Sequence, residues 1–189
     1  MTNPSQSLPL TGQGLNKISL DEKIKKILEI LKKRHWTMGI MESCTGGAIV
    51  NAVTNIPGAS DVFECGLVTY SIKAKIEVGV EEKIIKKFGV YSIETAEEMA
   101  RKIDGDVGIG ITGNMNDPAE VFVAVRIENK VESVKLKVES KPTSSRLRRV
   151  AENEDEIEDC LRELRRVETR KEKKMKVVEK VVEMIRDNI

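Results

Sequence analysis

The feature that most constrains the fold is a strand-to-helix turn near the start of the chain. An apolar run at residues 36–41 leads into Glu42-Ser43-Cys44-Thr45-Gly46-Gly47, and a second apolar run follows at residues 48–53. The first run fits a short buried strand, and the second fits a helix that ends near Asn55, Pro57 and Gly58. The first N–H groups of such a helix lack intrahelical partners, and its dipole favours negative charge there. The turn is therefore a candidate site for an anion or an oxyanion.

Helices and strands alternate from residue 19 to residue 138. A helix begins after Ser19, which forms a capping box with Glu22, and its apolar residues at 20, 24, 27, 28 and 31 recur at helical spacing. Further along, the sequence predicts a strand at 62–71, a helical turn at 74–76, a helix at 81–88, and a second helix at 93–103 that Ser92 caps. A strand at 107–112 and a hairpin of strands at 121–127 and 131–138 follow. This order predicts an α/β fold: a three-layer sandwich-like domain with a mixed β-sheet covered by helices, plus a helical C-terminal extension.

Residues 143–189 contain neither Gly nor Pro, and charges of both signs alternate along them. Two sets of apolar residues follow heptad spacing: Ile157, Leu161 and Leu164, then Met175, Val178, Val182 and Ile185. Polar Glu168 and Lys171 interrupt the seam between them, so one long helix or two helices fit the pattern. We favour a solvated helical covering over a nucleic-acid-binding arm, with a coiled-coil oligomerisation element as the alternative.

Three segments with different roles are predicted. Residues 1–18 are rich in Ser, Pro, Gly and Asn and are expected to be a flexible N-terminal tail. Residues 19–140 form the α/β domain, and residues 141–189 form a charged helical segment that completes or extends it. The start lacks the basic region and apolar core of a signal peptide, and no run approaches the ~20 apolar residues of a membrane helix. We therefore expect a soluble, cytoplasmic protein with no membrane partner.

Composition excludes several classes of function. The 189 residues include 32 basic and 31 acidic side chains, so the net charge gives no support for binding nucleic acid. Aromatic residues make up 3%, which argues against stacking platforms for single strands. The three cysteines, Cys44, Cys65 and Cys160, show no pairing or metal-ligand spacing, as in a reducing compartment. The single histidine, His35, excludes a multi-histidine metal site, and we expect neither metal nor cofactor.

Two side chains in the 42–47 turn are candidate nucleophiles. Ser43 carries a hydroxyl, which is a weak nucleophile until a neighbouring base takes its proton. The single histidine is expected just before the strand, so a lysine is the candidate base, provided that burial lowers its pKa. Cys44 is the rival, since a helix N-terminus can lower the pKa of a thiol. The structural alternative for Ser43 or Thr45 is a helix cap, which is the commoner role for these residue types.

Two further clusters follow predicted strands. Tyr70 and Lys75 lie near the end of the 62–71 strand and in the turn after it, where a phenol beside an ammonium can relay a proton. The run Gly108-Ile109-Gly110-Ile111-Thr112-Gly113 ends another strand, and its spaced glycines indicate an element packed close to the backbone. A half-buried tyrosine beside surface lysines, and glycines kept for packing, are the structural alternatives. All three clusters lie at carboxyl ends of predicted strands, where an α/β fold gathers its site.

Five motifs occur in a fixed order along the chain. They are Glu42-Ser43-Cys44-Thr45-Gly46-Gly47, Asn55-Ile56-Pro57-Gly58-Ala59-Ser60, Val68-Thr69-Tyr70-Ser71-Ile72-Lys73-Ala74-Lys75, Gly89-Val90-Tyr91-Ser92 and Ile111-Thr112-Gly113. This series closely resembles the C-terminal domain of the competence-damage-inducible CinA family, whose stand-alone members include nicotinamide-nucleotide amidases. The resemblance covers roughly residues 20–127.

The resemblance implies hydrolysis of the carboxamide of nicotinamide mononucleotide to nicotinate mononucleotide and ammonia. By motif position, Ser43 would be the nucleophile, and Lys75 with Tyr70 would activate it and pass the proton to the leaving ammonia. Backbone N–H groups from Cys44 to Gly47 would stabilise the oxyanion or bind the nucleotide phosphate. The implied substrate-binding residues are Thr45, Gly46, Gly47, Thr112 and Gly113. The resemblance also implies a homo-oligomer.

The chain departs from the family pattern in two places. Only Asn114-Met115-Asn116-Asp117-Pro118-Ala119-Glu120 follows the Ile-Thr-Gly motif, where family members have a longer Gly- and Pro-rich loop ending in Lys-Pro-Val-Gly. The family's Gly-Asp-Arg segment before the last helix is missing, and Arg166 or Arg170 is the candidate replacement. Two alternatives therefore stay open: a non-catalytic or altered-specificity nucleotide-binding relative, and an interaction protein that works through residues 143–189.

Overall fold

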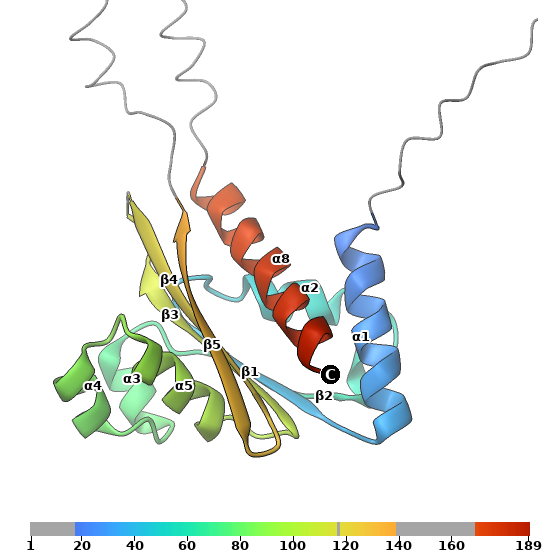
Figure 1. The fold of residues 1–189 in the computed structure, drawn as a ribbon, viewed down its shortest axis with the longest axis horizontal. Helices are drawn as coiled ribbons and strands as arrows, with labels where there is room; N and C mark the ends of the chain where they lie inside the picture. Colours follow the sequence, from blue (N-terminus) through green and yellow to red (C-terminus); the bar gives the residue numbers. More distant parts are fainter. Residues whose placement is uncertain (1–17, 117, 139–168) are drawn as a thin grey trace, which may run out of the picture.

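The computed structural model describes residues 18–116, 118–138 and 169–189. Its elements in chain order are α1 (Leu20–Arg34), β1 (Met38–Glu42), α2 (Ala48–Thr54), the 3-10 turn η1 (Ala59–Asp61), β2 (Phe63–Val68), α3 (Ile72–Glu77), α4 (Glu82–Phe88), α5 (Ile93–Lys102), β3 (Val107–Asn114), β4 (Ala119–Ile127), β5 (Lys130–Val138) and α8 (Arg170–Asn188). Helices α1, α2 and α8 cover one face of the sheet, and α3, α4 and α5 lie on the other (Figure 1). The predicted α/β class, with a mixed sheet between two helical layers, is confirmed.

The five-stranded sheet has the order β2-β1-β3-β4-β5. Strand β1 pairs in parallel with both β2 and β3, whereas β3, β4 and β5 pair in antiparallel fashion. Parallel strands point their carboxyl ends to the same edge of a sheet. The residues that follow β1 and β2 therefore lie beside the last residues of β3.

Capping residues define the helix starts as the sequence predicts. The Ser19 hydroxyl accepts from the Glu22 N–H at 3.2 Å, and the Glu22 carboxylate accepts from the Ser19 N–H at 3.1 Å. Ser92 caps α5 by accepting from the Thr95 N–H at 3.1 Å. On α1 the buried residues are Ile24, Ile27, Leu28 and Leu31, which form the stripe that helical spacing predicts.

The glycines of β3 allow α5 to lie directly on the strand. A Cβ atom at Gly110 would lie 2.0 Å from the Ala96 carbonyl oxygen, and one at Gly108 would lie 2.1 Å from that of Ala100. These distances leave no space for a side chain, so the predicted close approach is confirmed. The contact brings α5, and the segment just before it, against the centre of the sheet.

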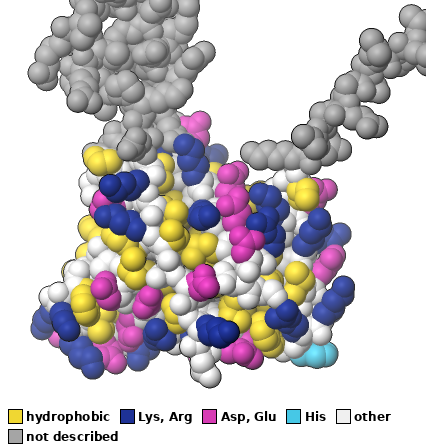
Figure 2. Space-filling model, viewed as in Figure 1, with side chains coloured by type: hydrophobic (Ala, Val, Ile, Leu, Met, Phe, Trp, Pro, Cys, Tyr) yellow, Lys and Arg dark blue, Asp and Glu magenta, His cyan; other side chains and the backbone are white. Residues whose placement is uncertain are grey.

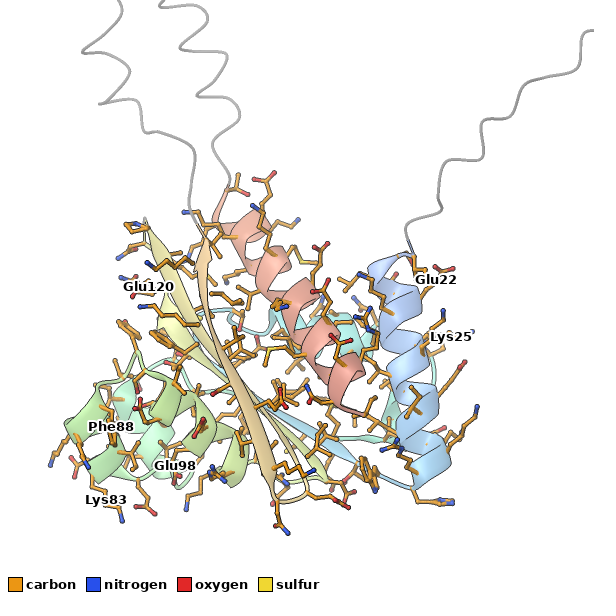
Figure 3. The ribbon with its side chains drawn as sticks, in the orientation of Figure 1. Glu22, Lys25, Lys83, Phe88, Glu98 and Glu120 are labelled. Atoms are coloured by element: carbon orange, nitrogen blue, oxygen red, sulfur yellow. The ribbon has the colours of Figure 1, made fainter. Side chains whose placement is uncertain are left out.

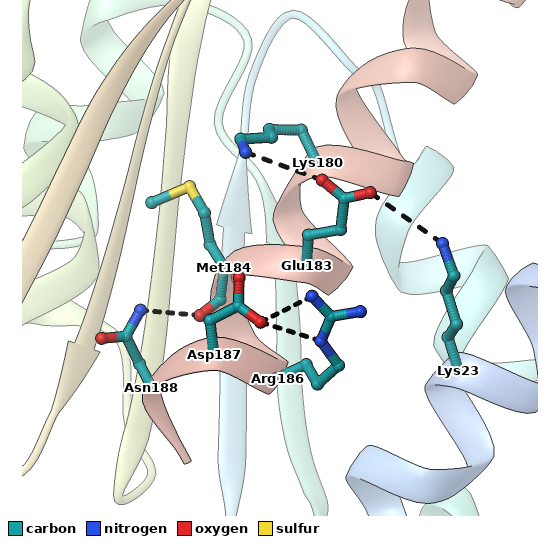
Figure 4. Close-up of polar contacts among 7 residues, drawn as sticks. All are labelled: Lys23, Lys180, Glu183, Met184, Arg186, Asp187 and Asn188. Atoms are coloured by element: carbon teal, nitrogen blue, oxygen red, sulfur yellow. Dashed lines mark hydrogen bonds and ion pairs between the residues drawn. The ribbon is translucent and has the colours of Figure 1, made fainter.

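Helix α8 is a layer of the domain. Its residues Val177, Val178, Val181, Val182 and Ile185 are buried in one core with α1 and the sheet. In its C-terminal half, Glu183 forms salt bridges with Lys23 of α1, at 3.9 Å, and with Lys180, at 3.6 Å (Figure 4). Met175 is 38% exposed, so its predicted place on an apolar heptad seam is wrong. The stripe is wider than a heptad seam because it packs on a sheet as well as on a helix. Ile157, Leu161 and Leu164 lie outside the described residues.

Several strand boundaries differ from the predictions, including those of β1 and β2. Strand β1 begins at Met38, two residues later than the apolar run. Strand β2 ends at Val68, whereas the prediction reached Ser71. The chain leaves the sheet there because the Ser71 hydroxyl accepts from the Ala74 N–H at 3.0 Å and starts α3. The predicted helical turn at 74–76 is accordingly longer, at Ile72–Glu77.

Charged side chains of both signs alternate over the surface. The face in Figure 2 shows Lys, Arg, Asp and Glu interspersed, and the labelled Glu22 and Lys25 of α1 point outward in Figure 3. None of the helices in the described ranges is both long and apolar enough to cross a membrane. Residues 1–17 of the tail predicted at 1–18, and Cys160, lie outside those ranges.

Candidate active site

A pocket of about 190 Å³ lies where β1, β2 and β3 end. Its lining residues come from the turn after β1, the segment after β2, the end of β3, the segment before α5, and the first turn of α8. They are Ser43, Cys44, Tyr70, Tyr91, Gly113, Asn114, Met115, Asn116 and Arg170. The edge of the sheet on which the three sequence clusters converge thus holds a pocket.

Ser43 is paired with a buried lysine. The Lys75 ammonium lies 3.0 Å from the Ser43 Oγ, and it donates to the Thr69 carbonyl oxygen at 2.6 Å. The Lys75 side chain is 0% exposed, and burial lowers its pKa from 10.5 to about 8. None of the carboxylates in the described part of the chain forms an ion pair with it. A lysine in this state is available as a base near neutral pH.

A surface helix usually buries its apolar side chains and exposes its lysines, and α3 does the opposite at Lys75. On α3 the lysine points inward, while Ile72 and Ile76 are partly or largely exposed. A buried charge beside exposed apolar residues contradicts the local pattern, and such contradictions concentrate at functional sites. Surface lysines were the structural alternative at this position, and Lys75 does not have that environment.

Burial makes the thiol of Cys44 less reactive, whereas it makes the amine of Lys75 available as a base. Cys44 lines the pocket beside Ser43, but its side chain is buried and its pKa is raised to about 11 by that burial. A thiol with this pKa stays protonated near neutral pH, and the protonated form is a poor nucleophile. Among the two candidate nucleophiles, the geometry therefore favours Ser43.

Glu42 closes the N-terminal end of α2. Its carboxylate is fully buried and accepts from the N–H groups of Ile49 and Val50, at 3.4 and 3.1 Å. Those two donors are among the unpaired groups that the sequence offers for an external anion. The chain fills this position with its own carboxylate, a role that the sequence did not indicate because Glu42 sits in an otherwise apolar strand.

The other predicted site residues divide into two groups. Tyr70 and Gly113 line the pocket, and the Tyr70 hydroxyl accepts from the Arg170 guanidinium at 3.2 Å. Thr45 and Thr112 are fully buried and do not line it. The Thr112 hydroxyl donates to the Val90 carbonyl oxygen at 2.8 Å, whereas the Thr45 hydroxyl has no hydrogen-bond partner among the described residues.

The glycines after Ser43 shape the turn. Gly46 and Gly47 have φ values of 62° and 92°, a left-handed conformation that side chains disfavour. A Cβ at Gly46 would lie 3.1 Å from the Lys174 Nζ of α8. Helix α8 therefore brings a second cation, besides Arg170, next to this turn. Of the two candidate arginines, Arg170 lies at the pocket and Arg166 lies outside the described residues.

Sequence reasoning did not assign Tyr91, Asn114, Met115 or Asn116 to the site, although all four line it. The Gly89-Val90-Tyr91-Ser92 motif was a signal for the first. The shortened loop was a signal for the other three, because it directly follows the Ile-Thr-Gly motif. In the structure, the Asn114 side chain accepts from the Asn116 N–H at 2.9 Å. Within the described ranges, no three His, Cys, Asp or Glu side chains converge as metal ligands would.

The fold and the site together define an α/β protein with a serine–lysine pair at the ends of parallel strands. The model of the CinA C-terminal domain matches residues 20–161, and the chain belongs to this family. A competence-damage inducible protein of Moorella thermoacetica is 49% identical over 89 residues, which are 44% of this chain and 22% of that protein. One from Caldicellulosiruptor saccharolyticus is 35% identical over 137 residues, which are 66% of this chain and 33% of that protein. The chain thus spans a third or less of these relatives.

Solved structures show the same fold. The competence/damage inducible protein of Agrobacterium tumefaciens has a TM-score of 0.68 at 23% identity, with 88% of this chain and 93% of that chain covered. A CinA superfamily protein of Enterobacter cloacae has a TM-score of 0.67 at 22% identity, with 98% of both chains covered. At these identities the likeness concerns the fold alone.

Proposed function

We propose that the protein hydrolyses the carboxamide of nicotinamide mononucleotide, releasing nicotinate mononucleotide and ammonia. The observation that carries the proposal is the 3.0 Å contact between the Lys75 Nζ and the Ser43 Oγ, with the lysine buried and its pKa lowered to about 8. This pair supplies a nucleophile and a base without histidine. The family resemblance of the Ser43, Tyr70 and Lys75 motifs supplies the substrate.

In the first half of the reaction, neutral Lys75 takes the proton of the Ser43 hydroxyl. The Thr69 carbonyl accepts one N–H of Lys75 and so holds Nζ beside Ser43, where the lone pair of the neutral amine can accept the hydroxyl proton. The Ser43 Oγ bonds to the carboxamide carbon, and the negative charge moves to the carboxamide oxygen. Because Glu42 occupies the Ile49 and Val50 donors, we assign the oxyanion to N–H groups earlier in the turn, within the segment from Cys44 to Gly47.

In the second half, the Lys75 ammonium returns its proton to the leaving nitrogen, directly or through the Tyr70 hydroxyl. The carbon–nitrogen bond breaks, ammonia leaves, and an ester to Ser43 remains. Lys75, neutral again, takes a proton from water, which attacks the ester carbon. Cleavage of the bond between the ester carbon and the Ser43 Oγ then releases the nicotinate product, and the Lys75 ammonium returns its proton to the Oγ, which restores the Ser43 hydroxyl and the neutral amine.

An ammonia-release assay on nicotinamide mononucleotide tests the proposal. We expect turnover by the wild-type protein, and a loss of at least about a thousandfold in kcat for Ser43→Ala and for Lys75→Ala. Lys73→Ala is the matched control, since Lys73 lies on the same helix, is exposed, and pairs with Glu77. Wild-type protein that binds the nucleotide but leaves its amide intact would contradict the proposal.

The shortened loop favours a second candidate, a nucleotide-binding protein with altered specificity or without turnover. Asn114, Met115 and Asn116 form this loop and line the pocket, so a change here alters what the pocket accepts. Thermal stabilisation by a nucleotide without turnover would support this candidate. The coiled-coil alternative has less support, because the apolar stripe of α8 is buried in its own domain. A homo-oligomer stays a proposal.

A further inference from the structure

Both tyrosines of this chain line the same pocket. The sequence has two Tyr, three Phe and one Trp, and neither Phe nor Trp lines it. Tyr91 is 53% exposed and Tyr70 is 64% exposed. A single exposed aromatic residue needs no explanation. Two of the six aromatic residues of the chain line one pocket, however, and this clustering indicates a function.

The backbone on both sides of Tyr91 is fixed. The Val90 carbonyl accepts from the Thr112 hydroxyl, which ties the residue before it to β3. The Ser92 hydroxyl donates to the Gly89 carbonyl at 3.0 Å and caps α5, which ties the residue after it. Tyr91 is thus an exposed ring on an anchored backbone, a state in which little freedom is lost when a ligand packs on it. Thr112, buried and outside the pocket, is a positioning residue for this ring.

The charges around the ring favour one class of ligand. Among the described residues, Arg170 is the one charged residue that lines the pocket, and none of the described carboxylates lines it. Arg170 suits an anionic group, and it already holds the hydroxyl of Tyr70. For the positive charge of a ligand, the lining offers two aromatic rings, and the face of such a ring attracts cations through the ring quadrupole.

We propose that Tyr91 is a specificity-determining contact that selects a flat, positively charged heteroaromatic ring, while Arg170 receives the anionic end of the same ligand. The inference rests on the proposed function, since an oxidised pyridine nucleotide carries both groups. It goes further by assigning the recognition of ring charge to one residue. The selected feature is the charge of the ring, and the reduced, uncharged form of the same nucleotide is disfavoured.

Isothermal titration of Ser43→Ala protein tests this with two probes, nicotinamide mononucleotide and its reduced dihydropyridine form. Both carry the same ribose and phosphate. We expect the oxidised probe to bind about fivefold or more tightly than the reduced one, and Tyr91→Ala to remove most of this preference. Tyr91→Phe keeps the ring and is expected to retain it. Phe88→Ala is the matched control, because Phe88 is an exposed aromatic residue on α4 outside the pocket (Figure 3).

The outcomes separate this inference from the proposed function. An unchanged preference in Tyr91→Ala, or no binding of either probe, overturns the role of Tyr91. A preference that depends on Tyr91, in a protein whose wild type releases no ammonia, supports the role and overturns the amidase. In an active enzyme, Tyr91→Ala is expected to raise KM about fivefold or more and to change kcat less.

Discussion

The two halves of the candidate site differ in their exposure to water. On one side, Ser43, Lys75 and Glu42 are buried, and each has hydrogen-bond partners within the domain. On the other side, Tyr91 and Arg170 are exposed. The buried half comes from β1, the residue after it and α3, whereas the exposed half comes from the segment before α5 and from α8, far apart in the sequence.

The difference shows how one small pocket can separate chemistry from recognition. Removing Lys75 from water is what lowers its pKa, so the reacting half has to be buried. A surface that recognises a ligand has to remain accessible until the ligand arrives. We therefore expect the buried half to respond to pH and to changes in stability, and the exposed half to respond through affinity.

Of the effects that separate the two halves, the pH dependence of turnover should be the largest. Lys75 is active as the neutral amine, and its pKa is lowered to about 8. The kcat/KM for nicotinamide mononucleotide should therefore rise tenfold per unit as pH increases toward about 8 and level off above it, since one group loses one proton. Ammonia release measured from pH 6 to pH 9.5 checks this. A flat profile below pH 8 would remove Lys75 from the role of base.

Glu42→Ala should give the next largest effect, on folding. The substitution leaves the N–H groups of Ile49 and Val50 without their acceptor in a buried place. We expect the free energy of unfolding to fall by about 2 kcal/mol, as for other unpaired buried polar groups. Denaturant unfolding measures it. Glu42→Gln should lose less stability, because its single amide oxygen can still accept from one of the two N–H groups, which bond to different oxygens of Glu42. Equal losses in both variants would contradict this account.

Arg170→Ala should have the smallest effect and should leave the buried half intact. We expect KM to rise about fivefold, with kcat changed less than about twofold and the stability within about 0.5 kcal/mol. Steady-state kinetics and denaturant unfolding on the same preparation check both parts. Lys171→Ala is the matched control, since its side chain is next on α8 but does not line the pocket. A large drop in kcat would place Arg170 among the reacting groups.

Local pattern predicted most of the fold. The Ser19 box, the Ser92 cap and the apolar spacing of α1 depend on neighbours within one or two turns, which a sequence displays directly. The glycines of β3 predicted a close contact but not its partner, α5. Met175 was misplaced because a heptad seam and a stripe against a sheet share several positions.

The candidate site was predicted in part. The sequence alone predicts the strand-to-helix turn, the hydroxyl of Ser43 inside it, and the convergence of strand ends near it, because parallel pairing follows from the order of the elements. Three features depend on packing between distant segments: Lys75 is buried against Ser43, Glu42 fills the end of α2, and Tyr91 and Arg170 line the same pocket. Burial and the pKa that it shifts depend on what packs around a residue, and that packing comes from segments distant in the chain.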